Sequence, residues 1–205
     1  MPYQQIRYEV KDKIATIYFS RPENMNSYTP LMCEEINRAL DAADNDLEVR
    51  AVIFTGGGGT KKPTFCAGFD LNYSDNPFSY LTDYSVYEAE DTGGINAIRI
   101  WEMRKPVIAA INGSAVGVGM TITLPMDVKI CSEKAKMGFV FARRGFVCDA
   151  ASSWFLPRIV GPSKAVELCC SGRVFNAQEA LRMGLVTEVV PEDKVYERAV
   201  EIAKV

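Results

Sequence analysis

Two short glycine-containing segments carry the clearest chemical signal in the sequence. The first, INGSAVGVGMT at residues 111–121, follows the apolar run PVIAAI and contains Gly113, Gly117 and Gly119. Glycine lets the main chain adopt positive φ and lets another group approach it closely. A turn that opens into a helix also presents unpaired N–H groups and the positive end of the helix dipole. This segment is therefore predicted to bind an anionic group.

The spacing of these glycines excludes the two common phosphate-binding motifs. A dinucleotide fingerprint needs G-x-G-x-x-G, but Ile122 stands in place of the third glycine, and a P-loop needs a lysine that does not follow Gly119. The second segment, FCAGFDL at residues 65–71, is another small-residue turn that follows a glycine-rich loop. If the two turns converge, each can direct one N–H at the same oxygen, which is the arrangement of an oxyanion hole. A tight turn without a ligand is the alternative.

The chain contains no histidine, which excludes Ser-His-Asp and Cys-His nucleophiles and every histidine-containing zinc site. Acid–base chemistry must then come from carboxylates, lysine, tyrosine or cysteine. The six cysteines have neither CxxC pairs nor metal-ligand spacing, so no metal site is predicted. Because the first ten residues lack the apolar core of a secretory signal, free thiols and a cytoplasmic location are expected.

The bulk composition is that of one globular domain. The chain has 205 residues, of which 48% are hydrophobic and 24% charged, and its net charge is -3. It has no extended basic patch, so no nucleic-acid partner is expected. The uncharged stretch from Pro106 to Met126 is long enough to cross a bilayer, but its prolines, glycines and polar residues fit a buried α/β segment. No membrane partner is therefore expected.

Segments with strand and helix patterns alternate along the chain, which predicts an α/β fold. The expected strands cover residues 13–19, 49–59 (running into a glycine loop), 106–111, 127–132 and 185–190. The expected helices begin at Pro30 behind an N-cap at Thr29, cover 94–104, 120–126 and 191–205, and run from an N-cap at Asn176 to Gly184. A polar, tyrosine-rich stretch at residues 72–92 is predicted to form a mobile or partly helical lid.

Three motifs resemble one protein family when they are taken together. RPENMNS at residues 21–27, FCAGFDL at 65–71 and INGSAVGVG at 111–119 occur in the order and spacing of the crotonase superfamily, the enoyl-CoA hydratases and isomerases. Residues 136–161 and 177–186 are also similar to that family, so the resemblance covers essentially the whole chain.

The resemblance implies a fold, a substrate and an assembly. The fold would be a crotonase-like spiral of ββα units with flanking helices, forming a single domain over residues 1–205. The substrate would be an acyl-CoA thioester, with coenzyme A as part of the substrate and no other cofactor. The family assembles into homotrimers or hexamers through C-terminal helices, and these helices look incomplete in this sequence.

The resemblance also implies roles for individual residues. The main-chain N–H groups of Phe69 and Val118 would hold the thioester oxygen as it becomes an enolate oxygen. Ala67 and the main chain around Asn24 and Met25 would contact coenzyme A. The other residues implied to contact the substrate or coenzyme A are Gly68, Gly117, Gly119, Thr121 and Phe141.

The base that the resemblance implies is unusual for a hydratase. Hydratases of the family hold and activate water with two glutamates, but Thr121 and Phe141 occupy those positions here, and neither side chain is a general base. Asp149 lies where isomerases of the family carry a carboxylate. One base that faces the thioester can take a proton from C2 and return it to C4, so double-bond isomerisation with Asp149 as the base is the leading prediction. The neighbours expected to desolvate this carboxylate and raise its pKa are Phe141, Phe146, Val147 and Trp154.

Four alternatives remain open. Asp149 could instead cap the helix that begins with AASSWFLP. It could act as a nucleophile, as in dehalogenases of the family, although those enzymes also use a histidine and a tryptophan that this chain lacks at the corresponding positions. The chain could hydrate its substrate with an atypical water-activating set. Finally, it could be a catalytically degenerate member that only binds coenzyme A esters or partner subunits.

Overall fold

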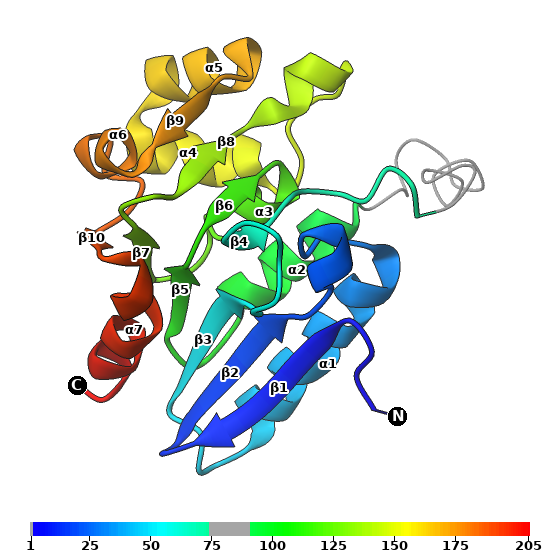
Figure 1. The fold of residues 1–205 in the computed structure, drawn as a ribbon, viewed down its shortest axis with the longest axis vertical. Coiled ribbons are helices and arrows are strands. Elements are labelled where there is room, and N and C mark those ends of the chain that lie inside the picture. Colours follow the sequence, from blue (N-terminus) through cyan, green and yellow to red (C-terminus); the bar gives the residue numbers. More distant parts are fainter. Residues whose placement is uncertain (1, 74–90) are drawn as a thin grey trace.

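The predicted α/β fold is confirmed in a computed structural model that describes residues 2–73 and 91–205 (Figure 1). The six-stranded sheet has the order β1-β2-β3-β5-β7-β10, and the four-stranded sheet has the order β4-β6-β8-β9. The strands of the larger sheet are β1 (Ile6–Lys11), β2 (Ile14–Phe19), β3 (Ala51–Gly56), β5 (Val107–Ile111), β7 (Val128–Ser132) and β10 (Glu188–Val190). The strands of the smaller sheet are β4 (Thr64–Cys66), β6 (Ser114–Val116), β8 (Lys136–Gly138) and β9 (Val174–Asn176).

Neighbouring strands in both sheets are parallel except for β1–β2 and β8–β9. The helices are α1 (Pro30–Asn45), α2 (Thr92–Trp101), α3 (Val118–Thr121), α4 (Ser152–Val160), α5 (Pro162–Ser171), α6 (Ala177–Arg182) and α7 (Val195–Ala203). Short 3₁₀ helices form at η1 (Pro22–Asn24), η3 (Val140–Arg144) and η4 (Glu192–Lys194).

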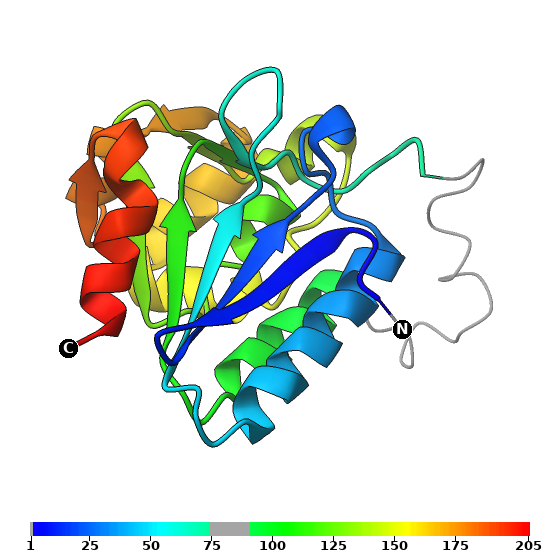
Figure 2. The ribbon, with the colours of Figure 1, turned by 60° about the horizontal axis from the view of Figure 1, so that its bottom comes forward.

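Strands β2, β3 and β5 at the centre of the larger sheet are buried on both faces, and their residues are accordingly apolar at most successive positions, whereas the edge strand β1 is largely exposed. Along β3, Val52 and Phe54 join the main core with the buried side chains of α1, whereas Ile53 packs in a second cluster with Val195 and Ala199 of α7. Successive side chains of a strand point to opposite faces, so α1 and α7 cover opposite faces of the sheet. Figure 2 shows α1 and α2 running side by side along the sheet.

Helix α1 begins as the sequence predicts. The hydroxyl of Thr29 accepts a hydrogen bond from the amide of Met32 at 3.1 Å, and Pro30 occupies the first helical position. The same hydroxyl donates to the side chain of Gln5, which ties the start of α1 to the N-terminal segment. One stripe of the helix is buried in the core, at Met32, Cys33, Glu35, Ile36, Ala39, Leu40 and Ala43.

Replacing Thr29 with alanine is expected to lower the free energy of unfolding by about 1 kcal/mol, because the Met32 amide loses its acceptor. Urea denaturation followed by circular dichroism measures this loss. The matched control is Glu34→Ala at an exposed position of the same helix, which is expected to change the free energy of unfolding by less than about 0.5 kcal/mol. Equal losses in the two variants would contradict the capping role.

The helix predictions downstream need corrections. Helix α2 spans Thr92–Trp101 rather than residues 94–104, because Asp91 caps it earlier than the apolar pattern indicates. The segment 120–126 contributes only the end of the one-turn helix α3, and hydrogen-bonded turns carry the chain to Met126. Most of the stretch predicted as a lid, residues 72–92, lies outside the described residues.

The strand expected at residues 185–190 is shorter, because only Glu188–Val190 pair as β10, and the helix expected at 191–205 divides into η4 and α7. The uncharged stretch from Pro106 to Met126 forms β5, β6 and α3, as expected of a buried α/β segment. Within residues 2–73 and 91–205, no helix has the length and apolar character needed to cross a bilayer. All six cysteines are free thiols.

Candidate active site

The two glycine turns lie side by side because they follow neighbouring parallel strands. Strand β4 pairs with β6, with Cys66 opposite Ala115, so residues 67–69 and 117–118 leave the same edge of the small sheet. A Cβ atom on Gly68 would lie 3.1 Å from the carbonyl oxygen of Val116. Gly68 has φ +94°, a main-chain conformation that residues other than glycine rarely adopt. The turns are thus in direct main-chain contact.

The turn at residues 117–118 presents an amide at the start of α3. The carbonyl of Gly117 accepts hydrogen bonds from the amides of Met120 at 2.8 Å and Thr121 at 3.0 Å. The amide of Val118, at the first position of the helix, has no hydrogen-bond partner in the described parts of the chain. Val118 lines the cavity described below, so its N–H can serve an external oxygen there.

The turn at residues 67–69 orients Phe69 through a short parallel bridge with Tyr28. The Tyr28 amide donates to the carbonyl of Gly68, and the Asp70 amide donates to the carbonyl of Tyr28, each at 2.8 Å. In such a bridge the residue between the two bonded positions directs its own amide to the opposite side. Asp70, the residue after this turn, forms a largely buried ion pair with Arg21 at 2.8 Å, which holds the end of the turn in place.

A cavity of about 620 Å³ opens where the two turns meet. The predicted site residues that line it are Ala67, Gly68, Phe69, Gly117, Val118, Phe141 and Asp149. Its other lining residues are Leu71, Asp91, Thr92, Gly93, Val116, Val140, Arg144, Phe146 and Val147. The lining is mostly apolar, so polar and charged groups that face the cavity interact more strongly than they would in water.

Four predicted residues do not line this cavity. Asn24 ends η1 and Met25 follows it. The Met25 carbonyl accepts a hydrogen bond from the amide of the lining residue Ala67 at 3.2 Å, so both residues lie next to the cavity. Gly119 lies behind the turn, where a Cβ atom would come within 2.4 Å of the Cys66 carbonyl oxygen. Thr121 is completely buried, and its hydroxyl donates to Oδ1 of Asp149 at 2.9 Å. Their predicted contacts with substrate or coenzyme A stay predictions.

Asp149 is a half-buried carboxylate at the cavity wall. Burial raises the pKa of Asp149 from 3.8 to about 7; the Thr121 hydroxyl lowers the pKa and the negative charge of Asp91 raises it further. Of the neighbours expected to desolvate it, Val147 is 88% exposed and can exclude little water, although it lines the same cavity as Phe141 and Phe146 do. Trp154 does not, and its exposed ring instead stacks against Arg158.

The alternative that Asp149 caps the following helix is wrong. Helix α4 begins at Ser152, and its N-cap is Ala151, which offers no side-chain acceptor. The Asp149 side chain is instead directed toward Thr121 of α3. Ala150 and Ala151 both have positive φ, 50° and 52°, and this double left-handed turn separates the carboxylate from the helix.

Asp91 is the acidic residue that sequence analysis missed. It lies at the cavity beside Asp149, with its side chain accepting the amides of Gly94 at 2.5 Å and Ala150 at 3.3 Å. The available signal was an aspartate followed by Thr-Gly-Gly before an apolar helical run, which is a capping pattern. Asp91 belongs to the stretch 72–92 that the sequence predicts to be a lid.

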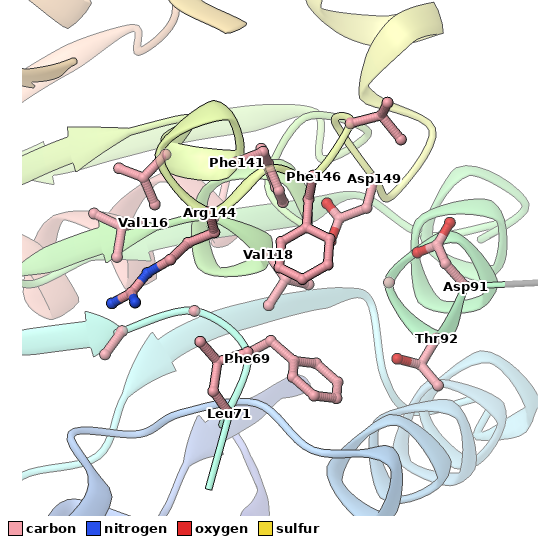
Figure 3. Close-up of a pocket in the computed structure, with 16 residues that line it drawn as sticks. Phe69, Leu71, Asp91, Thr92, Val116, Val118, Phe141, Arg144, Phe146 and Asp149 are labelled. Carbon is pink, nitrogen blue, oxygen red and sulfur yellow. The ribbon is translucent and has the colours of Figure 1, made fainter. Parts of the chain in front are cut away.

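The acidic and basic side chains that line the cavity lie on opposite sides of it (Figure 3). Figure 3 shows Asp91 and Asp149 on one side and Arg144 on the other, with Val118 and Phe69 between them. Arg144 is the one basic side chain among the described residues that line the cavity. Within the described parts of the chain, no cluster of three or more His, Cys, Asp or Glu could hold a metal ion.

Comparisons with known proteins agree on one family. The family model described as enoyl-CoA hydratase/isomerase matches residues 9–205. An enoyl-CoA hydratase of Alternaria alternata is 41% identical over 194 residues, which are 94% of this chain and 63% of the relative. A 1,2-epoxyphenylacetyl-CoA isomerase of Escherichia coli is 30% identical over 95% of this chain and 73% of its own length. The solved structure of an enoyl-CoA hydratase from Bacillus anthracis superposes with a TM-score of 0.84 at 31% identity, covering 98% of this chain and 76% of that one.

Proposed function

The chain belongs to the enoyl-CoA hydratase/isomerase family, and on that premise we propose that it shifts the double bond of an enoyl-CoA thioester through an enolate. The predicted family and crotonase-like fold are confirmed. The chain spans 63% of the length of the Alternaria relative, so the activity of the whole protein remains part of the proposal. Coenzyme A would be part of the substrate, and the proposed steps require no further cofactor.

One observation carries the proposal: a single cavity has the Val118 amide, the Phe69 turn and the Asp149 carboxylate on its wall. In the proposed reaction the amides of Phe69 and Val118 hold the thioester oxygen, and Asp149 removes a proton from C2. The negative charge moves to the held oxygen, and protonated Asp149 then delivers the proton to C4. Each amide donor contributes about 10²–10³ in rate to reactions of this type.

The residues that replace the two hydratase glutamates, Thr121 and Phe141, support isomerisation. Phe141 lines the cavity with an apolar ring, and the buried Thr121 hydroxyl is already used by Asp149. Neither residue can activate a water molecule as a base. A base with a pKa near neutrality can both accept and return a proton, as a 1,3-shift requires.

Hydration is the second candidate function, and two observations favour it. The Alternaria relative is named an enoyl-CoA hydratase, and Asp91 adds a second carboxylate to the side of the cavity where Asp149 lies. Such a pair could hold a water molecule in place of the two glutamates.

The experiment that tests the proposal incubates the purified protein in ¹⁸O-labelled water with a 3-enoyl-CoA and, separately, with a 2-enoyl-CoA, and analyses the products by mass spectrometry. Isomerisation converts the 3-enoyl-CoA into a 2-enoyl-CoA without label. Hydration converts the 2-enoyl-CoA into a labelled 3-hydroxyacyl-CoA. A protein that only binds coenzyme A esters gives neither product and does not exchange C2 hydrogen of a saturated acyl-CoA in D₂O. The predicted trimeric or hexameric assembly stays a prediction, and sedimentation equilibrium tests it.

The pH dependence of the reaction should follow the ionisation of Asp149. Because the base must be ionised, kcat/KM is expected to rise about tenfold per pH unit below pH 7 and to level off above it. Steady-state assays between about pH 5 and pH 9 measure this profile, with circular dichroism as the check that the protein stays folded. A flat profile across neutrality would contradict the assignment.

A further inference from the structure

Asp91 connects the start of α2 to the turn that carries Asp149. Its Oδ1 atom accepts the amide of Gly94 at 2.5 Å, which caps α2, and also the amide of Ala150 at 3.3 Å. Ala150 directly follows Asp149, so this hydrogen bond fixes the main chain next to the carboxylate. A helix cap needs only the first of these contacts.

The turn held by Asp91 is strained. Ala150 and Ala151 have φ of 50° and 52°, a left-handed conformation that residues other than glycine seldom adopt because Cβ crowds the following carbonyl oxygen. The contact with α2 is also tight, because a Cβ atom on Gly93 would lie 3.1 Å from the Cβ of Ala150. Strained main chain persists where its surroundings hold it, and it occurs often beside reactive groups.

Asp91 also influences Asp149 through its charge. Among the described residues, the groups around the Asp149 carboxyl are Asp91 at the start of α2, the Thr121 hydroxyl of α3, Arg144 of η3 across the cavity, and the neighbouring Cys148 thiol. Asp91 is the like charge in this set, and its charge raises the pKa of Asp149. Half-buried charges in an apolar cavity are poorly screened, so the effect persists at moderate ionic strength.

We propose that Asp91 is a positioning residue for Asp149: its hydrogen bond to Ala150 directs the Asp149 carboxylate into the cavity, and its own carboxylate lies on the same cavity wall as a like charge. This inference rests on the proposed function in that Asp149 is taken as the base. Asp91 itself needs no contact with the substrate.

Two substitutions separate the hydrogen bond from the charge. Asp91→Asn keeps an oxygen for the amides of Gly94 and Ala150 but removes the charge, so the acid limb of the pH–rate profile is expected to move to lower pH. Asp91→Ala removes both, and kcat is expected to fall about 10- to 100-fold with little change in KM, because the base is misplaced. Asp91→Asn should retain clearly more of kcat than Asp91→Ala.

The matched control is Asn176→Ala, which removes the N-cap of α6 outside the cavity lining. It is expected to lower Tm by about 2–4 °C without a change in kcat or in the pH profile. The inference is overturned if Asp91→Ala loses no more kcat than Asn176→Ala.

A direct titration keeps this test independent of the proposed function. The pKa of Asp149 can be measured by ¹³C NMR of the labelled carboxyl, with Asp149→Asn used to assign the signal. A lower pKa in Asp91→Asn supports the charge coupling whatever reaction the protein catalyses, and an unchanged pKa overturns it. An active Asp149→Asn variant would contradict the proposed function, but the titration would still test whether Asp91 influences the pKa of Asp149.

Discussion

Replacing Asp149 with asparagine should lower kcat for isomerisation of a 3-enoyl-CoA by about 10²–10⁴, which is the range for loss of a general base. Asparagine has the same shape and can still accept the Thr121 hydroxyl, so the geometry of the wall is retained. It has no basic oxygen that could carry the proton from C2 to C4. KM should change little, because the proposed contacts of the thioester oxygen lie with Phe69 and Val118.

The stability of the Asp149→Asn variant distinguishes a catalytic from a structural carboxylate. Burial raises the pKa of Asp149 from 3.8 in the unfolded chain to about 7, so the folded state binds this proton more tightly. The resulting stability is complete below about pH 4 and is lost as the pH rises through about 7. Asparagine does not titrate, so the variant is expected to gain thermal stability relative to the wild type most clearly above pH 7.

The matched control for this variant is Asp127→Asn, outside the cavity lining, where the carboxylate accepts the Val107 amide at 2.8 Å. This control should keep kcat. Full activity in Asp149→Asn would contradict the assignment of Asp149 as the base. Loss of activity together with loss of folding at every pH would indicate that Asp149 has a structural role.

Much of the fold follows from local patterns that the sequence displays. The strand expected at residues 13–19 forms at Ile14–Phe19, and the helix expected to begin at Pro30 does so, because β-branched runs, an N-cap threonine and a proline act locally. The one-turn helix α3 covers Val118–Thr121, whereas the sequence predicts a longer helix over residues 120–126. The apolar run that follows it packs in the core as hydrogen-bonded turns, and hydrophobic pattern alone cannot separate a buried turn from a buried helix.

The site was less accessible from sequence because it depends on contacts between distant segments. The glycine turns could be named as amide donors, but their side-by-side placement follows from the pairing of β4 with β6. Asp91 and Ala150 are far apart in the sequence and meet through one hydrogen bond that no local motif indicates. A capping aspartate looks the same in the sequence whether it caps a helix only or also holds a catalytic turn.

Replacing Gly117 with alanine is expected to lower kcat by about 10²–10³, the loss typical for one oxyanion donor. Gly117 has φ 54° and ψ -130°, a combination open to glycine and strongly unfavourable for alanine. The added methyl group itself has room, since the nearest heavy atom, Cα of Gly68, would lie 3.8 Å away. The strain would therefore be relieved by rotation of the main chain, which moves the amide of Val118.

Gly161→Ala is the control that separates main-chain strain from the loss of an amide donor. Gly161 has φ 82° and ψ 153°, is also restricted to glycine, has open space around its Cα and is not part of the cavity lining. Both variants should lose comparable thermal stability, while only Gly117→Ala should lose kcat. Because the amide binds the oxygen most strongly once it carries negative charge, the loss should appear in kcat more than in KM. If the two variants lose kcat equally, the strain acts through general destabilisation and the Val118 amide is not a donor to the reacting oxygen.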